Sequence, residues 1–242
     1  MIGHALFQPD LVPGLRLRSI AATQSLLGDT IALSDGDWQT PSGLPGWARA
    51  HVATHLVAHA GQAEDTAIRL LRGQRSITWT IQPAISAADL EAGSRRPALD
   101  LQTALDTSSA HLIELFDRFD ADDWSLSLST PIGPLSAVAL FLARLNEVVL
   151  HHVDLRLGLS LSAIEPTVVD WLLAWNALRI GPRLGHLSIR LLSDEGFDTV
   201  IGTGTRQVEV RGSGPSLLGW LTGRLDSSAV LGAEGVDLGG PA

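Results

Sequence analysis

The chain has no cysteine, no tyrosine and no lysine, and each absence excludes a type of chemistry. Without cysteine it can form no disulfide, no thiolate cage for a structural zinc ion and no thiol nucleophile of its own. Without lysine it has neither a Schiff-base residue nor the lysine of a phosphate-binding P-loop. The catalytic groups that remain are those of Ser, Thr, His, Asp, Glu and Arg. A reaction that needs a thiolate must therefore take it from a small molecule.

The charge and the hydrophobic pattern narrow the possible partners. All 17 basic residues are arginine, and 26 acidic residues leave a net charge of −9. This charge argues against a nucleic-acid partner, because phosphates need a basic face. No apolar run reaches the roughly 18 residues of a membrane span, and the N-terminus lacks the basic segment and apolar core of a signal peptide. We expect a soluble, cytoplasmic protein that acts on a small molecule.

The first two thirds of the sequence have apolar residues at helical spacing in four long stretches. Helices are predicted at residues 11–33, 47–72, 98–119 and 135–157. Between them we predict a turn at 34–37, a looser stretch at 73–97 with a short helix near 87–91, and a loop rich in Asp and Ser before 135. Four long amphipathic helices are typical of a four-helix bundle, in which facing helices can form a metal site.

After Gly158 the pattern changes, and we place a domain boundary near residue 160. One more helix is predicted at 166–179 and a last one at 215–221, before a glycine-rich tail. Between these helices, three short alternating segments predict antiparallel strands at 186–192, 199–201 and 207–210. The predicted fold class is α+β, with a helical bundle in residues 1–160 and a small α+β domain in residues 161–242.

Three histidines, His51, His55 and His59, follow one another at four-residue steps, which places them on nearly one face of a helix. The outer two are about 12 Å apart along the helix axis, too far to share one ion held between helices. We choose the central His55 as a candidate ligand, because Val52 and Leu56 beside it indicate burial. His51 lies near the helix start, and His59 precedes a polar run. A histidine in such a helix is more often solvated or simply hydrogen-bonded.

A second helix carries a polar stripe, Arg144, Glu147, His151 and Asp154, on an otherwise apolar sequence. Ionisable groups in such a setting are costly to bury unless they are paired or bound to a metal. Two interpretations remain open from the spacing alone. One is a metal site; the other is a buried ion-pair network in which Arg144 pairs with Glu147 and His151 with Asp154. His152 points away from this stripe and is expected to be structural or exposed.

Together, His55, Glu147 and His151 would supply two nitrogen ligands and one oxygen ligand from two facing helices. That is the donor set of a catalytic divalent-metal site, which keeps one position open for water or substrate. A metal ion held there is expected to take part in chemistry rather than to hold the fold together.

Three segments carry a resemblance to a known family: residues 44–55 (LPGWARAHVATH), 144–155 (RLNEVVLHHVDL) and 212–224 (GSGPSLLGWLTGR). In these segments the chain resembles the mycothiol-dependent maleylpyruvate isomerase family, and their order and spacing extend over essentially the whole sequence. The two segments of the bundle are more specific than the third. The resemblance implies a DinB-like helical bundle in the N-terminal part and a smaller C-terminal domain similar to sterol-carrier-like folds.

The resemblance also implies cofactors and residue roles. The metal would be zinc, with His55, Glu147 and His151 as its ligands, and the thiol cofactor would be mycothiol, which suits a chain without cysteine. Arg224 matches a functional arginine of the smaller domain. Arg224, together with Arg144, would hold a substrate carboxylate through bidentate hydrogen bonds.

The implied reaction is a cis–trans isomerisation. Zinc favours the thiolate form of the cofactor, and this thiolate adds to the cis double bond of maleylpyruvate. The resulting single bond rotates, and the thiolate leaves to give fumarylpyruvate. In this scheme Glu147 binds the metal and transfers no proton, and Asp154 orients His151 as a hydrogen-bond acceptor.

Other interpretations stay open, because kinship in fold does not settle chemistry. A zinc-dependent S-transferase would use the same activated thiolate of mycothiol, or of another small thiol, and leave it on a different electrophile. A non-enzymatic protein would retain the metal and bind an apolar ligand or a partner through its C-terminal domain. A zinc hydrolase has less support, because no second carboxylate is clearly placed as a base beside the three ligands. An inert ion-pair network would bind no metal.

Overall fold

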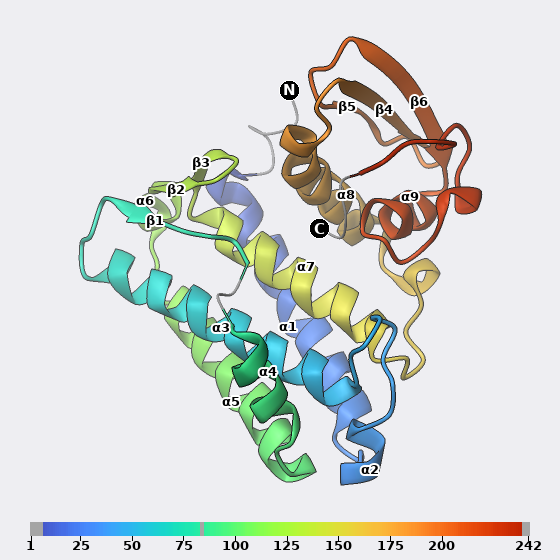
Figure 1. The fold of residues 1–242 in the computed structure, drawn as a ribbon. Helices are drawn as coiled ribbons and strands as arrows, with labels where there is room; N and C mark the ends of the chain where they lie inside the picture. Colours follow the sequence, from blue (N-terminus) through green and yellow to red (C-terminus); the bar gives the residue numbers. More distant parts are fainter. Residues whose placement is uncertain (1–6, 83–84, 239–242) are drawn as a thin grey trace. The chain divides into compact units, whose positions relative to one another are not determined.

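The computed structural model describes residues 7–82 and 85–238. The chain divides into two compact units, one formed by Phe7–Leu159 and the other beginning at Ser160 (Figure 1). The predicted α+β fold class is confirmed: the first unit is mainly helical, and the second contains a small sheet with helices. The division into domains at residues 1–160 and 161–242 stays a proposal, because compactness in space does not test independent folding.

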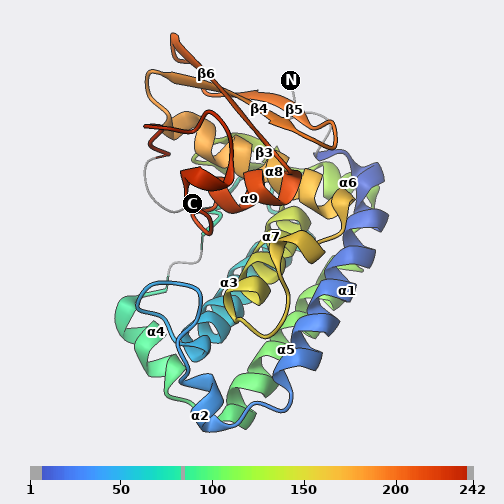
Figure 2. The ribbon, with the colours of Figure 1, turned by 90° about the vertical axis from the view of Figure 1, so that its right-hand side faces the viewer.

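The first unit is built on the four long helices that the sequence predicted. They are α1 (Val12–Thr30), α3 (Arg49–Leu71), α5 (Ala98–Phe116) and α7 (Val138–Asp154). Helix α3 packs against α5 and α7, and α1 packs against the same two helices, so the four form a closed ring in cross-section (Figures 1 and 2). Helices α1, α5 and α7 end three residues earlier than predicted and α3 one residue earlier, because helix ends are the least certain part of a sequence prediction.

The core of this bundle combines small residues on α3 with a completely buried stretch of α7. The buried alanines of α3 allow close approach of the neighbouring helices; they are Ala50, Ala53, Ala60, Ala63 and Ala67. In α7 every residue from Val138 to Leu150 is buried. A helix that is buried on all sides must find partners inside the protein for each polar side chain that it carries. This requirement sets the geometry of the candidate site.

Short elements connect the long helices. Where the sequence predicted a turn at 34–37, Ser34 and Asp37 form a capping box that starts the helix α2 (Asp35–Trp38). The short helix predicted near 87–91 is α4 (Ala87–Ser94), which packs against α3. A further short helix, α6 (Ala121–Ser125), begins with a second capping box at Asp120.

A small sheet corrects the sequence prediction, which gave only loops in this part of the chain. Its strands are β1 (Ile77–Thr78), β2 (Ser127–Thr130) and β3 (Gly133–Ser136), in the order β1-β2-β3. Strand β1 runs parallel to β2, and β2 forms an antiparallel hairpin with β3. Strands of two to four residues are too short to show the alternation that identifies a strand in sequence.

The second unit pairs two helices with a three-stranded sheet. Its helices are α8 (Pro166–Ile180) and α9 (Gly214–Leu221), and its strands are β4 (Leu187–Ser193), β5 (Asp198–Ile201) and β6 (Arg206–Gly212), in the order β5-β4-β6. Helices α8 and α9 pack on each other and on the same side of the sheet (Figure 1). This arrangement gives the unit its own apolar core.

The direction of β6 was predicted wrongly. The alternating segments predict antiparallel neighbours throughout, and β4 and β5 do pair in this way, but β6 runs parallel to β4. The connection between β5 and β6 crosses the beginning of β4, where the amide of Gly204 donates to the carbonyl of Leu187 at 3.1 Å. A Cβ atom on Gly204 would lie 1.9 Å from the carbonyl carbon of His186. Glycine therefore makes this crossing possible.

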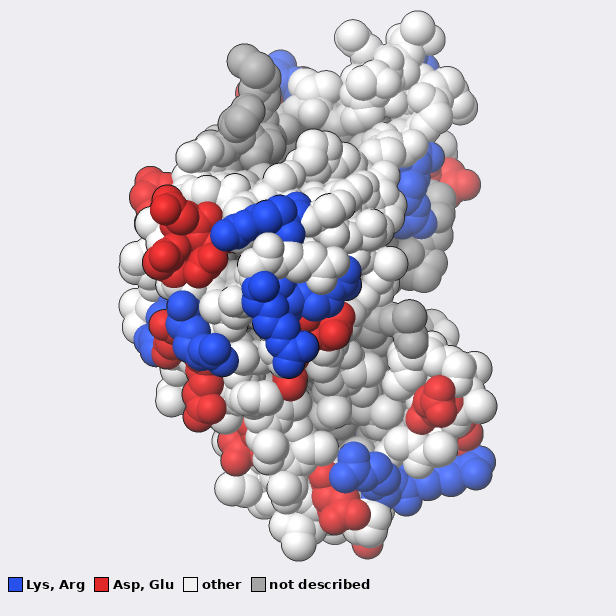
Figure 3. Space-filling view, turned by 90° about the vertical axis from the view of Figure 1, so that its left-hand side faces the viewer, with Lys and Arg blue, Asp and Glu red and all other residues white. Residues whose placement is uncertain are grey.

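The surface carries charges of both signs. On the face drawn in Figure 3, arginine and acidic side chains lie beside each other rather than in separate areas. Arg16 pairs with Asp117 at 2.6 Å, and Arg95 pairs with Glu91 at 2.7 Å. Exposed pairs of this kind contribute little to stability, so the fold depends on its buried contacts. Among the described residues, no helix is both long enough and apolar enough to cross a membrane.

We predict that Gly204→Ala destabilises the second unit by roughly 1–3 kcal/mol, because the added methyl group overlaps the backbone of His186. The measurement is the urea midpoint followed by Trp fluorescence. Gly181→Ala is the matched control, since its Cβ would meet only the amide nitrogen of Gly202 at 3.4 Å. Equal midpoints for the two variants would show that the crossing loop does not need glycine.

Candidate metal centre

The structure brings His55, Glu147 and His151 together where α3 packs against α7. The Nε2 atom of His55 lies 3.0 Å from Oε2 of Glu147, and Nε2 of His151 lies 3.2 Å from the same oxygen. One candidate ligand atom from each residue lies within 4.8 Å of the other two. The two imidazole rings meet edge to face, with their centroids 4.8 Å apart. The grouping predicted from spacing is thus present, and its role as a ligand set stays a prediction.

The two histidines that contact Glu147 determine its charge state. This side chain is 6% exposed, and burial alone would raise the pKa of its carboxyl group. Hydrogen bonds with His151 and His55 act against burial and, with the positive potential of nearby histidines, bring the pKa well below its usual value. Glu147 is therefore ionised at neutral pH, as a metal ligand must be.

Asp154 holds His151 in one orientation. Its Oδ2 lies 2.8 Å from Nδ1 of His151, and its side chain is 3% exposed. Burial lowers the pKa of His151, but the hydrogen bonds with Asp154 and Glu147 outweigh it and leave this pKa raised. Because Asp154 occupies Nδ1, the nitrogen that faces Glu147 and His55 is Nε2. A carboxylate behind a ligand histidine is the usual support of a metal site.

This donor set fits a divalent metal ion. Two imidazole nitrogens and a carboxylate oxygen are ligands that zinc accepts, and three protein ligands leave a fourth position for a small molecule. The alternative ion-pair network is only partly present. His151 pairs with Asp154, whereas Arg144 donates to the carbonyl of Leu56 at 2.8 Å and to Oγ of Ser109 at 3.0 Å.

Arg144 therefore connects three helices, α7, α3 and α5. Its guanidinium is buried, and burial lowers its pKa to about 10, against the attraction of Glu147. The group remains a cation at neutral pH. With two of its nitrogens bonded to Leu56 and Ser109 inside the bundle, the placement does not favour the predicted contact with a substrate carboxylate.

Arg224, the other predicted arginine, lies in the second unit directly after α9. Gly223 has a φ of +71° and ends the helix, and the amide of Arg224 donates to the carbonyl of Gly219 at 2.8 Å. Its guanidinium is half-buried and donates to the carbonyl of Thr222 at 3.2 Å. Its contact with a substrate stays a prediction.

The remaining histidines of the two helices have distinct roles. Nδ1 of His51 accepts from the amide of Ala48 at 3.1 Å and Nε2 contacts Glu91 at 3.0 Å, so this residue caps the start of α3. His152, predicted to be structural or exposed, is structural: it is buried and lies 2.8 Å from Oδ2 of Asp29. Nothing in the sequence pointed to Asp29 as its partner, because the two are far apart along the chain.

His59 is buried, which the sequence pattern did not indicate. The polar run that follows it indicated exposure, yet its side chain is 1% exposed. Burial lowers the pKa of His59 to about 3; Glu147 opposes this shift, while Arg144 and His55 add to it. The imidazole is therefore neutral at physiological pH. Its position one turn after His55 on the same face was the signal that could have identified it.

Comparisons with known proteins show the family and the fold of this chain. The sequence model of the mycothiol maleylpyruvate isomerase N-terminal domain family matches residues 20–156, more than half of the chain, and this range contains all three candidate ligands. Two solved structures, a mycothiol-dependent maleylpyruvate isomerase and a histidine-to-alanine mutant of that enzyme, each superpose with a TM-score of 0.79 at 19% identity and cover 95% of both chains. This likeness shows a shared fold. A search of curated proteins returned no match.

We predict that Asp154→Asn weakens zinc binding about 10- to 100-fold, because the amide no longer holds His151 as a carboxylate does. Competition with a chromophoric chelator measures this affinity. Asp29→Asn is the matched control: it removes the carboxylate beside His152, which lies outside the ligand set. Unchanged zinc affinity in Asp154→Asn would contradict the orienting role.

We also predict that zinc stabilises the protein more at high pH than at low pH. Because the pKa of His151 is raised, this histidine keeps its proton below the raised pKa, and zinc must displace that proton. In the metal-free protein, protonated His151 stabilises the folded state at pH values below the pKa that this histidine has in the unfolded chain. This stabilisation is lost as the pH rises through the higher pKa that His151 has in the folded protein. We therefore expect zinc to raise the Tm more at pH 8 than at pH 6. Calorimetry with and without zinc tests this, and an absence of any shift at both values would favour the ion-pair network.

Proposed function

This chain belongs to the mycothiol maleylpyruvate isomerase N-terminal domain family, and on that premise we propose that it is an enzyme that isomerises maleylpyruvate to fumarylpyruvate with zinc and mycothiol. The observation that supports this proposal most is the convergence of His55, Glu147 and His151 within the matched range. A chance grouping of two histidines and a glutamate would be expected on the exposed surface. Instead they lie on two packed helices, with Glu147 ionised and buried.

In the proposed reaction, the cofactors supply the thiolate and the metal ion, and the protein holds them in place. A divalent metal ion held by the three residues would favour the thiolate form of a coordinated thiol at neutral pH. The chain itself provides no thiol. Its own contribution is to hold the donors: Asp154 fixes His151 from behind, and Glu147 stays ionised because His55 and His151 both contact its Oε2 atom.

Glu147 is proposed as a ligand and not as a general acid or base. A carboxyl group whose pKa lies well below its usual value has little capacity to carry a proton at neutral pH. Both histidines face its Oε2 atom, which favours binding a cation at this place over proton transfer to a substrate. This assignment also sets the proposal apart from a zinc hydrolase, which needs an additional base near the metal.

Substrate recognition is assigned to Arg224. Maleylpyruvate carries two carboxylates, and a guanidinium binds a carboxylate through two parallel hydrogen bonds. For Arg144 we propose a structural role in place of the substrate contact predicted from the sequence. Its contacts with Leu56 and Ser109 fix α3 and α5 against α7 and thereby position the helices that carry the metal ligands.

The test is turnover of maleylpyruvate by zinc-loaded protein, with mycothiol present and then withheld. We predict formation of fumarylpyruvate that requires the thiol and that falls at least about 100-fold in His55→Ala, because one metal ligand is lost. The change in ultraviolet absorbance of the substrate follows the reaction, and zinc content is measured in parallel.

His111→Ala is the control for this experiment, since His111 lies on α5, is half exposed and pairs with Glu64. Its turnover should equal that of the original protein. If zinc is bound and no fumarylpyruvate forms, the isomerase assignment is wrong. Consumption of mycothiol with another electrophile would then identify the protein as a thiol S-transferase.

A further inference from the structure

Among the described histidines of the helical unit, His59 alone has a buried ring nitrogen, Nδ1, without a hydrogen-bond partner. Among the described residues of α3, α5 and α7, each remaining histidine lies beside a carboxylate. The pairs are His51 with Glu91, His55 and His151 with Glu147, His111 with Glu64, and His152 with Asp29. His59 is 1% exposed, and its Nδ1 has no hydrogen-bond partner.

An unsatisfied buried nitrogen is costly, so its presence needs an explanation. Leaving such a group without a partner lowers the stability of the folded protein, and natural proteins retain few of them. Two of its neighbours on α3, Leu56 and Ala63, are buried and apolar. A leucine or methionine would suit this position better if packing were the only requirement.

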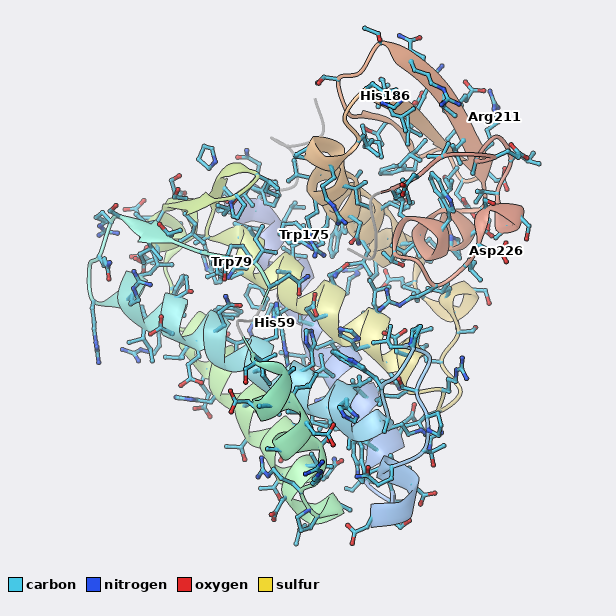
Figure 4. The ribbon with its side chains drawn as sticks, viewed as in Figure 1. His59, Trp79, Trp175, His186, Arg211 and Asp226 are labelled. Atoms are coloured by element: carbon cyan, nitrogen blue, oxygen red, sulfur yellow. The ribbon has the colours of Figure 1, made fainter. Side chains whose placement is uncertain are left out.

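The position of His59 connects it with the candidate metal centre. It follows His55 by one turn on the same face of α3, and Figure 4 shows it in the middle of this helix, where α3 passes α7. The groups that shift the pKa of His59 include Glu147, His55 and His151, which are the three candidate ligands.

A second unsatisfied atom lies one turn further along α3. The amide nitrogen of Gln62 donates to the hydroxyl of Thr80 and, at 3.0 Å, to the carbonyl of Gln82. Its amide oxygen, however, is buried without a partner. His59 and Gln62 are neighbours on the helix surface because they are three residues apart. Two consecutive turns of α3 beside the centre thus carry polar atoms that the protein does not satisfy.

The chemistry of His59 limits what it can bind. Its pKa of about 3 keeps the ring neutral, so it is no counter-ion for a carboxylate. A neutral imidazole offers one N–H donor and one lone pair. In the tautomer with a proton on Nδ1, this nitrogen donates to an uncharged oxygen such as that of a keto group. A neutral histidine in a buried site can polarise a carbonyl in this way.

We propose that His59 is a catalytic residue that donates a hydrogen bond to the keto oxygen of the substrate at the metal centre. The assignment rests on the proposed function, because it takes the ligand to be a keto acid with a conjugated double bond. When a thiolate adds to that double bond, a C–S bond forms and the electron pair of the C=C bond moves towards the keto oxygen. When the double bond re-forms, the pair returns and the C–S bond breaks. His59 stabilises the charge on oxygen and transfers no proton.

The first test is His59→Leu, which removes both ring nitrogens and keeps an apolar side chain of similar size. We expect kcat for maleylpyruvate to fall about 100-fold, as happens when one donor to a developing oxyanion is lost. Zinc content should be unchanged, because His59 lies outside the ligand set. The Tm should stay equal or rise, because an unsatisfied polar group has been replaced. His59→Asn, which keeps a donor near the position of Nδ1, should recover part of the loss.

The second test uses binding instead of turnover. Calorimetric titration of zinc-loaded protein compares fumarylpyruvate, which has the keto group, with maleate, which lacks it. We expect His59→Leu to weaken fumarylpyruvate binding about tenfold, the value of one hydrogen bond of roughly 1.4 kcal/mol, and to leave maleate binding unchanged. His111→Leu, with its half-exposed histidine, should match the original protein in every measurement.

The outcomes separate the two proposals. If the original protein turns over maleylpyruvate and binds fumarylpyruvate, and His59→Leu does both equally well, the assignment of His59 is wrong and the proposed function stands. A lower Tm or a loss of zinc in His59→Leu would overturn the assignment in favour of a structural role or a role in metal binding. If the original protein neither turns over maleylpyruvate nor binds fumarylpyruvate, the proposed function fails, and the assignment of His59 fails with it.

Discussion

The structure of the helical unit depends on one buried carboxylate, that of Glu147, and on the two histidines that contact it. A carboxylate at 6% exposure cannot remain ionised without compensation, and His55 and His151 provide it from two different helices. Removing one partner of such a buried group costs about 3–5 kcal/mol, because the other charge is left uncompensated. The contact therefore fixes the register of α3 against α7. A metal ion bound by these residues would balance the negative charge of Glu147 more completely than protons on the histidines do.

The rest of the bundle is arranged to permit this contact. The alanines on the inner face of α3 allow it to lie close to its neighbours, and α7 is buried along nearly its whole length. Arg144 adds a second connection by donating to the carbonyl of Leu56 and to Ser109. Asp154 pairs with His151, and Asp29 pairs with His152. Neither aspartate takes part in the contact between Glu147 and its two histidines. The contacts of Arg144 and His152 thus connect different helices, whereas Asp154 supports His151 from within α7.

The helices and the three candidate ligands could be predicted from the sequence because the signal is local. The spacing of Glu147 and His151 places both on one face of a helix whatever surrounds it. The β1–β3 sheet and the direction of β6 could not be predicted, since both depend on pairing between distant segments, such as Ile77 with Leu128. The burial of His59 was missed for a related reason. A polar run after it indicates exposure, whereas the side of α3 that faces α7 is decided by tertiary packing.

Two places where the sequence departs from stable packing lie at or near the candidate metal centre. A fully buried α7 with Glu147 at its centre, and a histidine without a partner on α3, both lower stability relative to apolar side chains of similar size. Natural sequences retain such departures mainly at functional sites and compensate for them elsewhere. Here the compensation is visible for every buried histidine of the site except His59. In the proposal made above, the partner of its Nδ1 atom comes from a bound substrate, as the thiol comes from a bound cofactor.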